Sequence, residues 1–214
     1  TRLDGRLQPQ PDLASAWDAS ADGRLITFTL RTDVSWHDGQ PLTADDVVYT
    51  LGALRELSPT TALLSDLRRI GQAEAPTTST VVISLTERYA PIFADLALPI
   101  LPRHLLLGKE IAALNFWDAP VGTGPFQLAE RSAGASVTLA ANPRYFRGAP
   151  LLDRVAFVVA DADVAVEALR DGRLALAELP WQQGQAATAA PGAQAGAYPE
   201  NGYYFVAFNT REGR

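Results

Sequence analysis

The chain has 214 residues, of which 47% are hydrophobic and 20% charged, enough to bury the core of one large domain or two small ones. Its net charge of -6 argues against nucleic acid as a partner, because phosphate binding needs a basic surface. It has no cysteine, which excludes disulfides, thiolate metal sites and a cysteine nucleophile. It also has no apolar stretch of the roughly 18 residues that a membrane span needs.

The N-terminal part predicts a short anchor followed by one strand. Residues 1–24 read as turns, and Leu13 and Trp17 are expected to hold this arm to a core. Asp22-Gly23 is typical of a hairpin turn. Residues 25–31 then alternate apolar and polar side chains, which is the period of a half-buried strand.

The stretch 33–51 predicts a tight turn that leads into a capped helix. Asp38-Gly39 is a turn dipeptide for which we expect a positive φ at the glycine, and Pro41 fixes φ just before the helix. Thr43 is the expected N-cap, and Asp46 lies three residues on, where its carboxylate can bond the N–H of the cap residue. The helix is expected to end near residue 57, with one apolar stripe formed by Val47, Val48, Leu51 and Leu54.

The rest of the chain predicts strands, short helices and turns in alternation. Before the glycine-rich junction at 121–125 we expect a helix break at 58–61, a short amphipathic piece, a strand at 80–86 and short helices within 89–98 and 99–107. The 80–86 strand is expected to share one sheet with 25–31, under the 44–57 helix. After the junction we expect a hairpin (126–131 and 136–140), a buried strand (154–159), a helix (164–170), a strand (174–179), a loop with a fragment of helix (182–197) and a strand (203–208). The strand–helix–strand order over 154–179 implies a parallel pair.

Six short motifs occur in a fixed order along the chain. They are Pro11-Asp12-Leu13-Ala14-Ser15-Ala16-Trp17, Phe28-Thr29-Leu30-Arg31, the run W-x-D-G-x-P-L-T-A-x-D-V at 36–47, Gly122-Thr123-Gly124-Pro125-Phe126, N-P-R-Y-F-R-G-A-P at 142–150 and Phe208-Asn209-Thr210. Together they resemble the signature of the family 5 extracytoplasmic solute-binding proteins, the peptide-, dipeptide- and nickel-binding receptors of ABC importers. One departure is Ala175, where the family usually has an aspartate.

This resemblance implies an α/β fold of the periplasmic-binding-protein type (type II, three-lobed). Residues 1–118 are expected to form the small accessory lobe, and residues 119–214 the first part of the main ligand-binding lobe. The chain begins at Thr1 and has no methionine, so we expect a piece of a longer protein whose opposing lobe follows residue 214. Such a piece is expected to bind solutes weakly by itself.

The function implied by the resemblance is capture of a small solute, such as a peptide, outside the cytoplasm by closure of the lobes. The implied partners are the permease subunits of an ABC transporter, and any membrane attachment would use a lipid anchor outside this chain. In the family, the strand corresponding to 203–208 runs beside the ligand cleft. The candidate ligand-binding residues are Ser58, Thr60, Thr61, Trp181, Tyr203, Tyr204 and Asn209, with strand core and helix capping as the alternative role for them.

Other chemistries find little support in the sequence. Asp45-Asp46 fits a helix N-terminus better than a carboxylate pair for acid–base work or Ca²⁺. His37 and His104 are the only histidines and lack partners at zinc-ligand spacing, so we expect structural or surface roles for them. The Gly122-Thr123-Gly124 run has no lysine after it, and it fits a backbone crossing better than a phosphate loop. We predict no metal, cofactor or catalytic residue.

Two functions stay open at this point. The first is the receptor of an ABC importer. The second is the solute-sensing domain of a bacterial transcriptional regulator, because some regulators resemble this family behind a helix-turn-helix. An enzyme is poorly supported because no catalytic set assembles.

Overall fold

The computed structural model describes residues 1–57, 62–109, 115–188, 194 and 196. The chain forms two compact units, Thr1–Phe157 and Val158–Arg214. No helix in these described ranges is long and apolar enough to cross a membrane.

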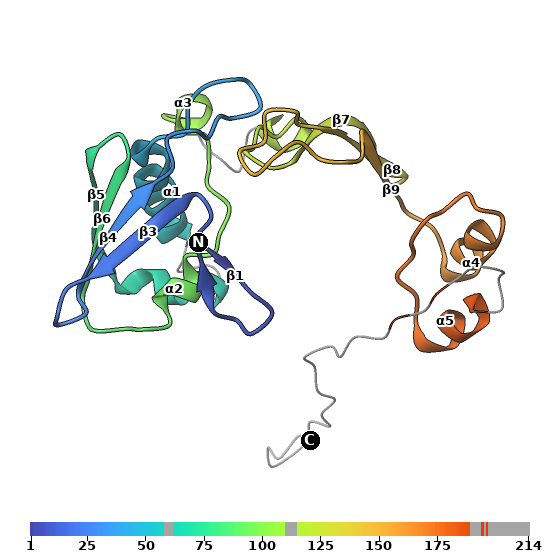
Figure 1. Cartoon of the computed structure of the whole chain (residues 1–214), viewed down its shortest axis with the longest axis horizontal. Helices are drawn as coiled ribbons and strands as arrows, with labels where there is room; N and C mark the ends of the chain where they lie inside the picture. The colour runs from blue at the N-terminus through green and yellow to red at the C-terminus, as the bar shows by residue number, and fades with distance from the viewer. Residues whose placement is uncertain (58–61, 110–114, 189–193, 195, 197–214) are drawn as a thin grey trace, which may run out of the picture. The chain divides into compact units, whose positions relative to one another are not determined.

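A four-stranded antiparallel sheet forms the centre of the first unit. Its strands are, in spatial order, β3 (Ala14–Ala19), β4 (Leu25–Leu30), β6 (Thr80–Leu85) and β5 (Ile70–Thr77). The helix α1 (Ala44–Leu57) packs against this sheet (Figure 1). The predicted pairing of the strands at 25–31 and 80–86 is confirmed, with Phe28 opposite Val81.

Buried and exposed side chains alternate along the two central strands, and the buried ones form the core between the sheet and α1. In β4 the buried side chains are Ile26, Phe28 and Leu30, and in β6 they are Val81, Ile83 and Leu85. A period of two places every second side chain on the same face, so six residues of two strands meet Leu51 of α1. Trp17 lies beside Phe28 and Phe93, with ring centroids 6.4 and 5.9 Å apart, which confirms that it anchors the N-terminal arm.

The two edge strands of this sheet were not predicted. Residues 1–24 were expected to form turns and a short anchor, and no strand was predicted there. In the structure β3 pairs with β4, and a pair of two-residue strands, β1 (Arg2–Leu3) and β2 (Pro9–Gln10), precedes β3. The sequence also gave no sign of β5, which contains Gly71, Glu74 and Pro76. Edge strands tolerate such residues because one side of the strand makes no ladder bonds. Their pairing partners, more than their own propensity, hold both strands in the sheet.

Short helical segments complete the first unit. They are η2 (Ala62–Arg69), α2 (Ile92–Asp95), α3 (Arg103–Leu106) and η4 (Asn115–Asp118). The predicted short helices within 89–98 and 99–107 are confirmed, and each covers a single turn. Ile92 and Leu106 are their fully buried side chains.

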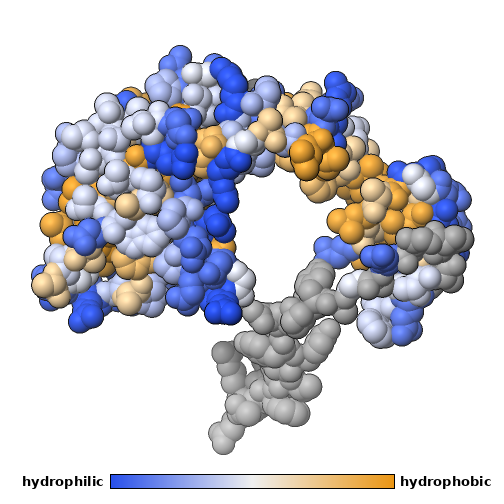
Figure 2. All heavy atoms as spheres, in the orientation of Figure 1, coloured by the Kyte–Doolittle hydropathy of each residue, from blue (hydrophilic) through white to orange (hydrophobic). Residues whose placement is uncertain are grey.

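A second sheet follows the glycine-rich junction. Its strands are β7 (Phe126–Ser132), β8 (Ser136–Ala141) and β9 (Arg154–Val158), in that order. The predicted hairpin through Gly134 is confirmed, and this glycine has a φ of 70°. The predicted strand at 154–159 is present but not buried, since Phe157 is 60% and Val159 72% exposed. Figure 2 shows hydrophobic surface over this region.

The second unit contains two short helices in its described part. α4 (Ala162–Arg170) confirms the predicted helix at 164–170, and α5 (Trp181–Ala187) is the predicted fragment of helix. The strand predicted at 174–179 was wrong, because these residues form no regular structure. The predicted helix break at 58–61 and the predicted strand at 203–208 lie outside the described residues.

The N-terminus of α1 is fixed by a single carboxylate. Asp46 is 4% exposed, and its Oδ2 accepts the N–H of Thr43 at 2.9 Å, as the capping motif predicts. The Thr43 hydroxyl also donates to Oδ2, at 3.3 Å. The other oxygen, Oδ1, accepts the N–H of Arg103 at 2.9 Å and so joins α1 to α3. Asp46 is thus a structural acceptor of three hydrogen bonds.

Replacing Asp46 by alanine should therefore destabilise the first unit by about 2–3 kcal/mol, because two partly buried N–H groups lose their acceptor. Its exposed neighbour is the control: Asp45→Ala removes only a dipole contact and should cost about 0.3–1 kcal/mol. Urea unfolding measures both free energies. Equal values for the two variants would contradict the role given to Asp46.

Candidate functional site

A five-residue reversal between α1 and the sheet shapes the candidate site. Ser35 and Pro41 form an isolated antiparallel bridge, and the N–H of Trp36 donates to the Gln40 carbonyl at 2.8 Å. The N–H of Gly39 donates to the Trp36 carbonyl at 2.9 Å, and Gly39 has a φ of 91°, as predicted. A positive φ of this kind is accessible to glycine at no steric cost.

The reversal sends neighbouring side chains in opposite directions. Trp36 is 1% exposed and belongs to the core of the sheet and α1. His37 and Asp38 instead line a groove of about 270 Å³. The opposite wall of the groove comes from the glycine-rich junction and β7, and consists of Ala119, Pro120, Val121, Gln127 and Leu128.

His37 joins the two walls through both ring nitrogens. Its Nδ1 accepts the N–H of Gly122 at 3.1 Å, and its Nε2 lies 3.0 Å from the Gly124 carbonyl. Nδ1 must be the bare nitrogen to accept, so the hydrogen is on Nε2 and the imidazole is neutral. The backbone adds a third bond, from the N–H of His37 to the Gly122 carbonyl at 2.8 Å. A structural role for His37 follows from these contacts.

Asn142 supports the same junction from the far end of β8. It is 6% exposed, and its side-chain amide donates to the Gly124 carbonyl at 3.1 Å. Its Oδ1 accepts the N–H of Arg144 at 3.0 Å, and its own N–H donates to the Pro125 carbonyl at 2.8 Å. The Gly124 carbonyl is therefore shared between His37 and Asn142.

The loop after Asn142 makes a second set of contacts to the first sheet. Phe146 packs against the hydrophobic core, and the guanidinium of Arg31 lies 5.2 Å from the centre of its ring. Arg147 Nη1 lies 3.5 Å from Asp12 Oδ1. The junction and this loop together hold β7 and β8 to the first sheet and α1.

Asp38 is the one acidic side chain of the groove, and it is already partnered. Its Oδ2 accepts a hydrogen bond from His104 Nε2 at 2.7 Å, and its Oδ1 accepts the N–H of Gln40 at 3.1 Å. Partial burial works to raise the pKa of the Asp38 carboxyl, but these hydrogen bonds outweigh it and lower the pKa below its ordinary value. The groove thus presents a stably ionised carboxylate beside an apolar wall.

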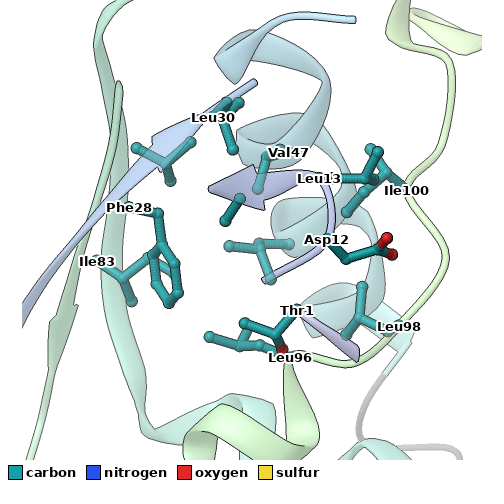
Figure 3. Close-up of a pocket in the computed structure, with 13 residues that line it drawn as sticks. Thr1, Asp12, Leu13, Phe28, Leu30, Val47, Ile83, Leu96, Leu98 and Ile100 are labelled. Carbon is teal, nitrogen blue, oxygen red and sulfur yellow. The ribbon is translucent and has the colours of Figure 1, made fainter. Parts of the chain in front are cut away.

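A second hollow lies in the core under α1 (Figure 3). It measures about 70 Å³ and is lined by apolar side chains from the sheet, α1 and the 96–100 segment, with Thr1 and Asp12 as its polar members. The Thr1 hydroxyl is used, since it donates to the Phe93 carbonyl at 3.1 Å. Solute sites combine an apolar lining with several placed polar groups. We therefore take the groove, not this cavity, as the candidate site.

Of the residues predicted to bind ligand, the structure describes Trp181, which does not line the groove. Trp181 is 70% exposed at the first position of α5. Ser58, Thr60, Thr61, Tyr203, Tyr204 and Asn209 lie outside the described residues. Within the described ranges, no group of three or more histidine, cysteine or acidic side chains is placed to hold a metal ion.

Sequence reasoning missed the groove, although its signal was present. Both walls come from family motifs, the W-x-D-G turn and the G-T-G-P-F junction, which are separated by more than 80 residues. The residues missed in this way are His37, Val121, Gln127 and Leu128.

Solved structures give the class of the fold. The oligopeptide-binding protein AppA from Bacillus subtilis, in complex with a nonapeptide, aligns with 89% of this chain and 39% of its own, with a TM-score of 0.79 and 27% identity. The ABC transporter substrate-binding protein CtaP from Listeria monocytogenes aligns with 85% of this chain and 38% of its own, with a TM-score of 0.77 and 29% identity. The fold is therefore the α/β fold of periplasmic-binding-protein-like receptors, and this chain contains part of it.

Sequence comparison gives the family. Residues 8–214 match the model of bacterial extracellular solute-binding proteins, family 5 Middle. Protein XP55 of Streptomyces lividans is 38% identical over 179 residues, which cover 83% of this chain and 33% of that protein. The chain belongs to the family 5 bacterial extracellular solute-binding proteins, and it spans about a third of the length of the relatives it matches.

Replacing Gly39 by valine should destabilise the first unit by about 1–3 kcal/mol, because a β-branched side chain is strained at a φ of 91°. The matched control is Gly52→Ala in the middle of α1, where an added Cβ meets nothing within 4 Å. The control should stabilise the protein by about 0.5–1 kcal/mol. Thermal melts of the two variants measure both; a Gly39→Val melt that matches wild type would contradict the strain at this turn.

The Asp38 pair should make stability depend on pH in one direction. A carboxyl whose pKa is lowered by folding stabilises the folded state above its unfolded pKa of about 4, and this contribution is lost as the pH falls through the folded value. Wild type should therefore melt above Asp38→Asn at pH 7, and the gap should close as the pH falls from about 4 towards 2. When His104 is also replaced by alanine, the difference in melting temperature that Asp38→Asn causes at pH 7 should be smaller. A difference that grows as the pH falls would contradict the lowered pKa of Asp38.

Proposed function

We propose that this chain forms one wall of the solute site in the extracytoplasmic receptor of an ABC importer, and that the solutes are peptides. The observation that carries the proposal is the groove of about 270 Å³ between the Asp38 turn and the glycine-rich junction. Two of the six family motifs build it. AppA, which aligns with 89% of this chain, was solved with a nonapeptide.

The chemistry of the groove fits a peptide. Val121, Leu128 and Pro120 offer an apolar surface for a side chain, and the amide of Gln127 carries both the donor and the acceptor that a peptide group needs. Asp38 supplies a negative charge, which favours a peptide N-terminus over a carboxylate at this end. Since His37, Asp38 and Asn142 are committed to structural hydrogen bonds, the groove would bind without chemistry.

The lobes follow from the same proposal. Residues 1–118 would be the accessory lobe, and residues 119–214 the first part of the main lobe. A further lobe of the longer receptor would close over the peptide, by hinge motion as in other binding proteins of this class. The proposed partners are the permease subunits, and the proposed location is the periplasm or the outer face of the membrane, with any lipid anchor outside this chain.

The ligand-binding role of Trp181 and of Ser58, Thr60, Thr61, Tyr203, Tyr204 and Asn209 is also a proposal. Trp181 is exposed, as a residue that meets a solute or another lobe must be before binding. A regulator's sensor domain, the second function left open by the sequence, would be distinguished by a DNA-binding helix pair in the upstream sequence in place of a signal peptide with a lipid-attachment cysteine.

Peptide binding to the groove is testable on this chain by NMR titration. A tripeptide with uncharged side chains should shift the amide signals of Val121, Gln127 and Leu128. Its dissociation constant should be near millimolar, a binding free energy of about -4 kcal/mol, because one wall buries only part of the ligand. Gln127→Ala should weaken binding several-fold. Glu130→Ala, on an exposed position of the same strand, should leave it unchanged. Two controls are a sugar and a single glycine that is acetylated at its N-terminus and amidated at its C-terminus. Signal shifts as large with either control as with the tripeptide, or no shift at the groove, would contradict the proposal.

A further inference from the structure

We propose that His37 is the positioning residue of the groove, and that it acts as a neutral imidazole that fixes the junction wall against the Asp38 turn. This inference rests on the proposed function, because it gives the groove its shape. It assigns a role to a side chain that needs no contact with the peptide itself.

Three hydrogen bonds converge on a short run of backbone. Gly122 donates its N–H to the ring Nδ1 of His37 and accepts the main-chain N–H of His37 at its carbonyl. The Gly124 carbonyl accepts from the ring Nε2. Among the described residues, no other side chain that lines the groove hydrogen-bonds across it from one wall to the other. Because Pro120 and Val121 directly precede Gly122, the position of this wall follows the position of the imidazole.

The glycine at 122 shows how close the contact is. A Cβ at this position would lie 3.4 Å from His37 Cε1, at the limit of ordinary van der Waals contact. The imidazole therefore lies directly against the backbone of the junction.

Asn142 also hydrogen-bonds to the junction, but it does not replace the contact that His37 makes between the junction and the Asp38 turn. It shares the Gly124 carbonyl with His37, but it directly follows β8 and has no hydrogen bond to the Asp38 turn among the described contacts. Loss of His37 would leave Gly124 bonded to β8 and release the junction from the turn. The expected result is a groove of altered width with both sheets still folded.

The tautomer provides a spectroscopic test. Long-range ¹H–¹⁵N spectra of the chain should show His37 with a protonated Nε2 and an unprotonated Nδ1 at neutral pH. The reverse tautomer, or a doubly protonated ring, would overturn the assignment, because Nδ1 could not then accept the N–H of Gly122.

Amide exchange separates positioning from general stabilisation. In His37→Ala the N–H of Gly122 should exchange about tenfold faster than in wild type, while amides in the centre of β4 and β6 keep their protection. His104→Ala is the matched control, because it removes the other histidine and a bond to the same turn but no contact with the junction. It should leave the exchange of Gly122 unchanged. Equal acceleration in both variants, or none in His37→Ala, would overturn the proposal.

Two conservative variants test the roles of the two ring nitrogens of His37 separately. The Oδ1 of an asparagine is as many bonds from Cα as the histidine Nδ1, and the Nε2 of a glutamine is as many bonds away as the histidine Nε2. His37→Asn should thus retain slow exchange at Gly122, and His37→Gln should not. The opposite order would overturn the proposed use of the two nitrogens.

The peptide titration links the residue to binding. His37→Ala should lose most of the peptide-induced shifts at Gln127 and Leu128, and His37→Asn should recover part of them. Retention of the full wild-type response in His37→Ala would overturn the positioning role. If wild type itself showed no peptide response, the proposed function at this groove would fail, and the exchange results would still decide whether His37 positions the junction.

Discussion

The reversal between Ser35 and Pro41 is the constraint on which the described site depends. Ser35 and Pro41 pair with each other, and the five residues between them reverse the chain with Gly39 at a positive φ. Trp36 and His37 are neighbours in this turn, and their side chains face opposite ways. One side chain completes the core beneath α1, and the next reaches the backbone of the junction. One short turn therefore links the packing of the core to the shape of the groove.

Several buried polar residues near this turn each join more than one segment of the chain. Asp46 caps α1 and also binds α3, Thr50 accepts the N–H of Leu101 while donating to the Asp46 carbonyl, and Asn142 binds Gly124, Pro125 and Arg144. Each of these three side chains is buried, and each makes several hydrogen bonds. Buried polar groups are stable only when satisfied, so these contacts fix one arrangement of the segments they join. The groove lies among such fixed segments, which suits a site that binds by shape.

The sequence predicted well those features that local chemistry controls. The positive φ of Gly39, the cap formed by Asp46, the central strands β4 and β6 and the hairpin at Gly134 all follow from residue types at short spacing. It failed where long-range pairing decides. The edge strands β3 and β5 have weak strand propensity and are held by their neighbours, and residues 174–179 have a strand-like pattern with no partner strand among the described residues. The groove was missed for the same reason, since its walls are more than 80 residues apart in the chain.

We propose above that a peptide contacts the junction wall and the Asp38 turn. Photo-crosslinking measures this contact directly. A tripeptide with a diazirine on its apolar side chain would be irradiated with the chain, and the attachment sites located by mass spectrometry. We expect attachment at residues 119–128 and at His37 and Asp38, suppressed by excess unlabelled peptide. Attachment confined to the second unit, around Trp181, or insensitive to competition, would contradict it.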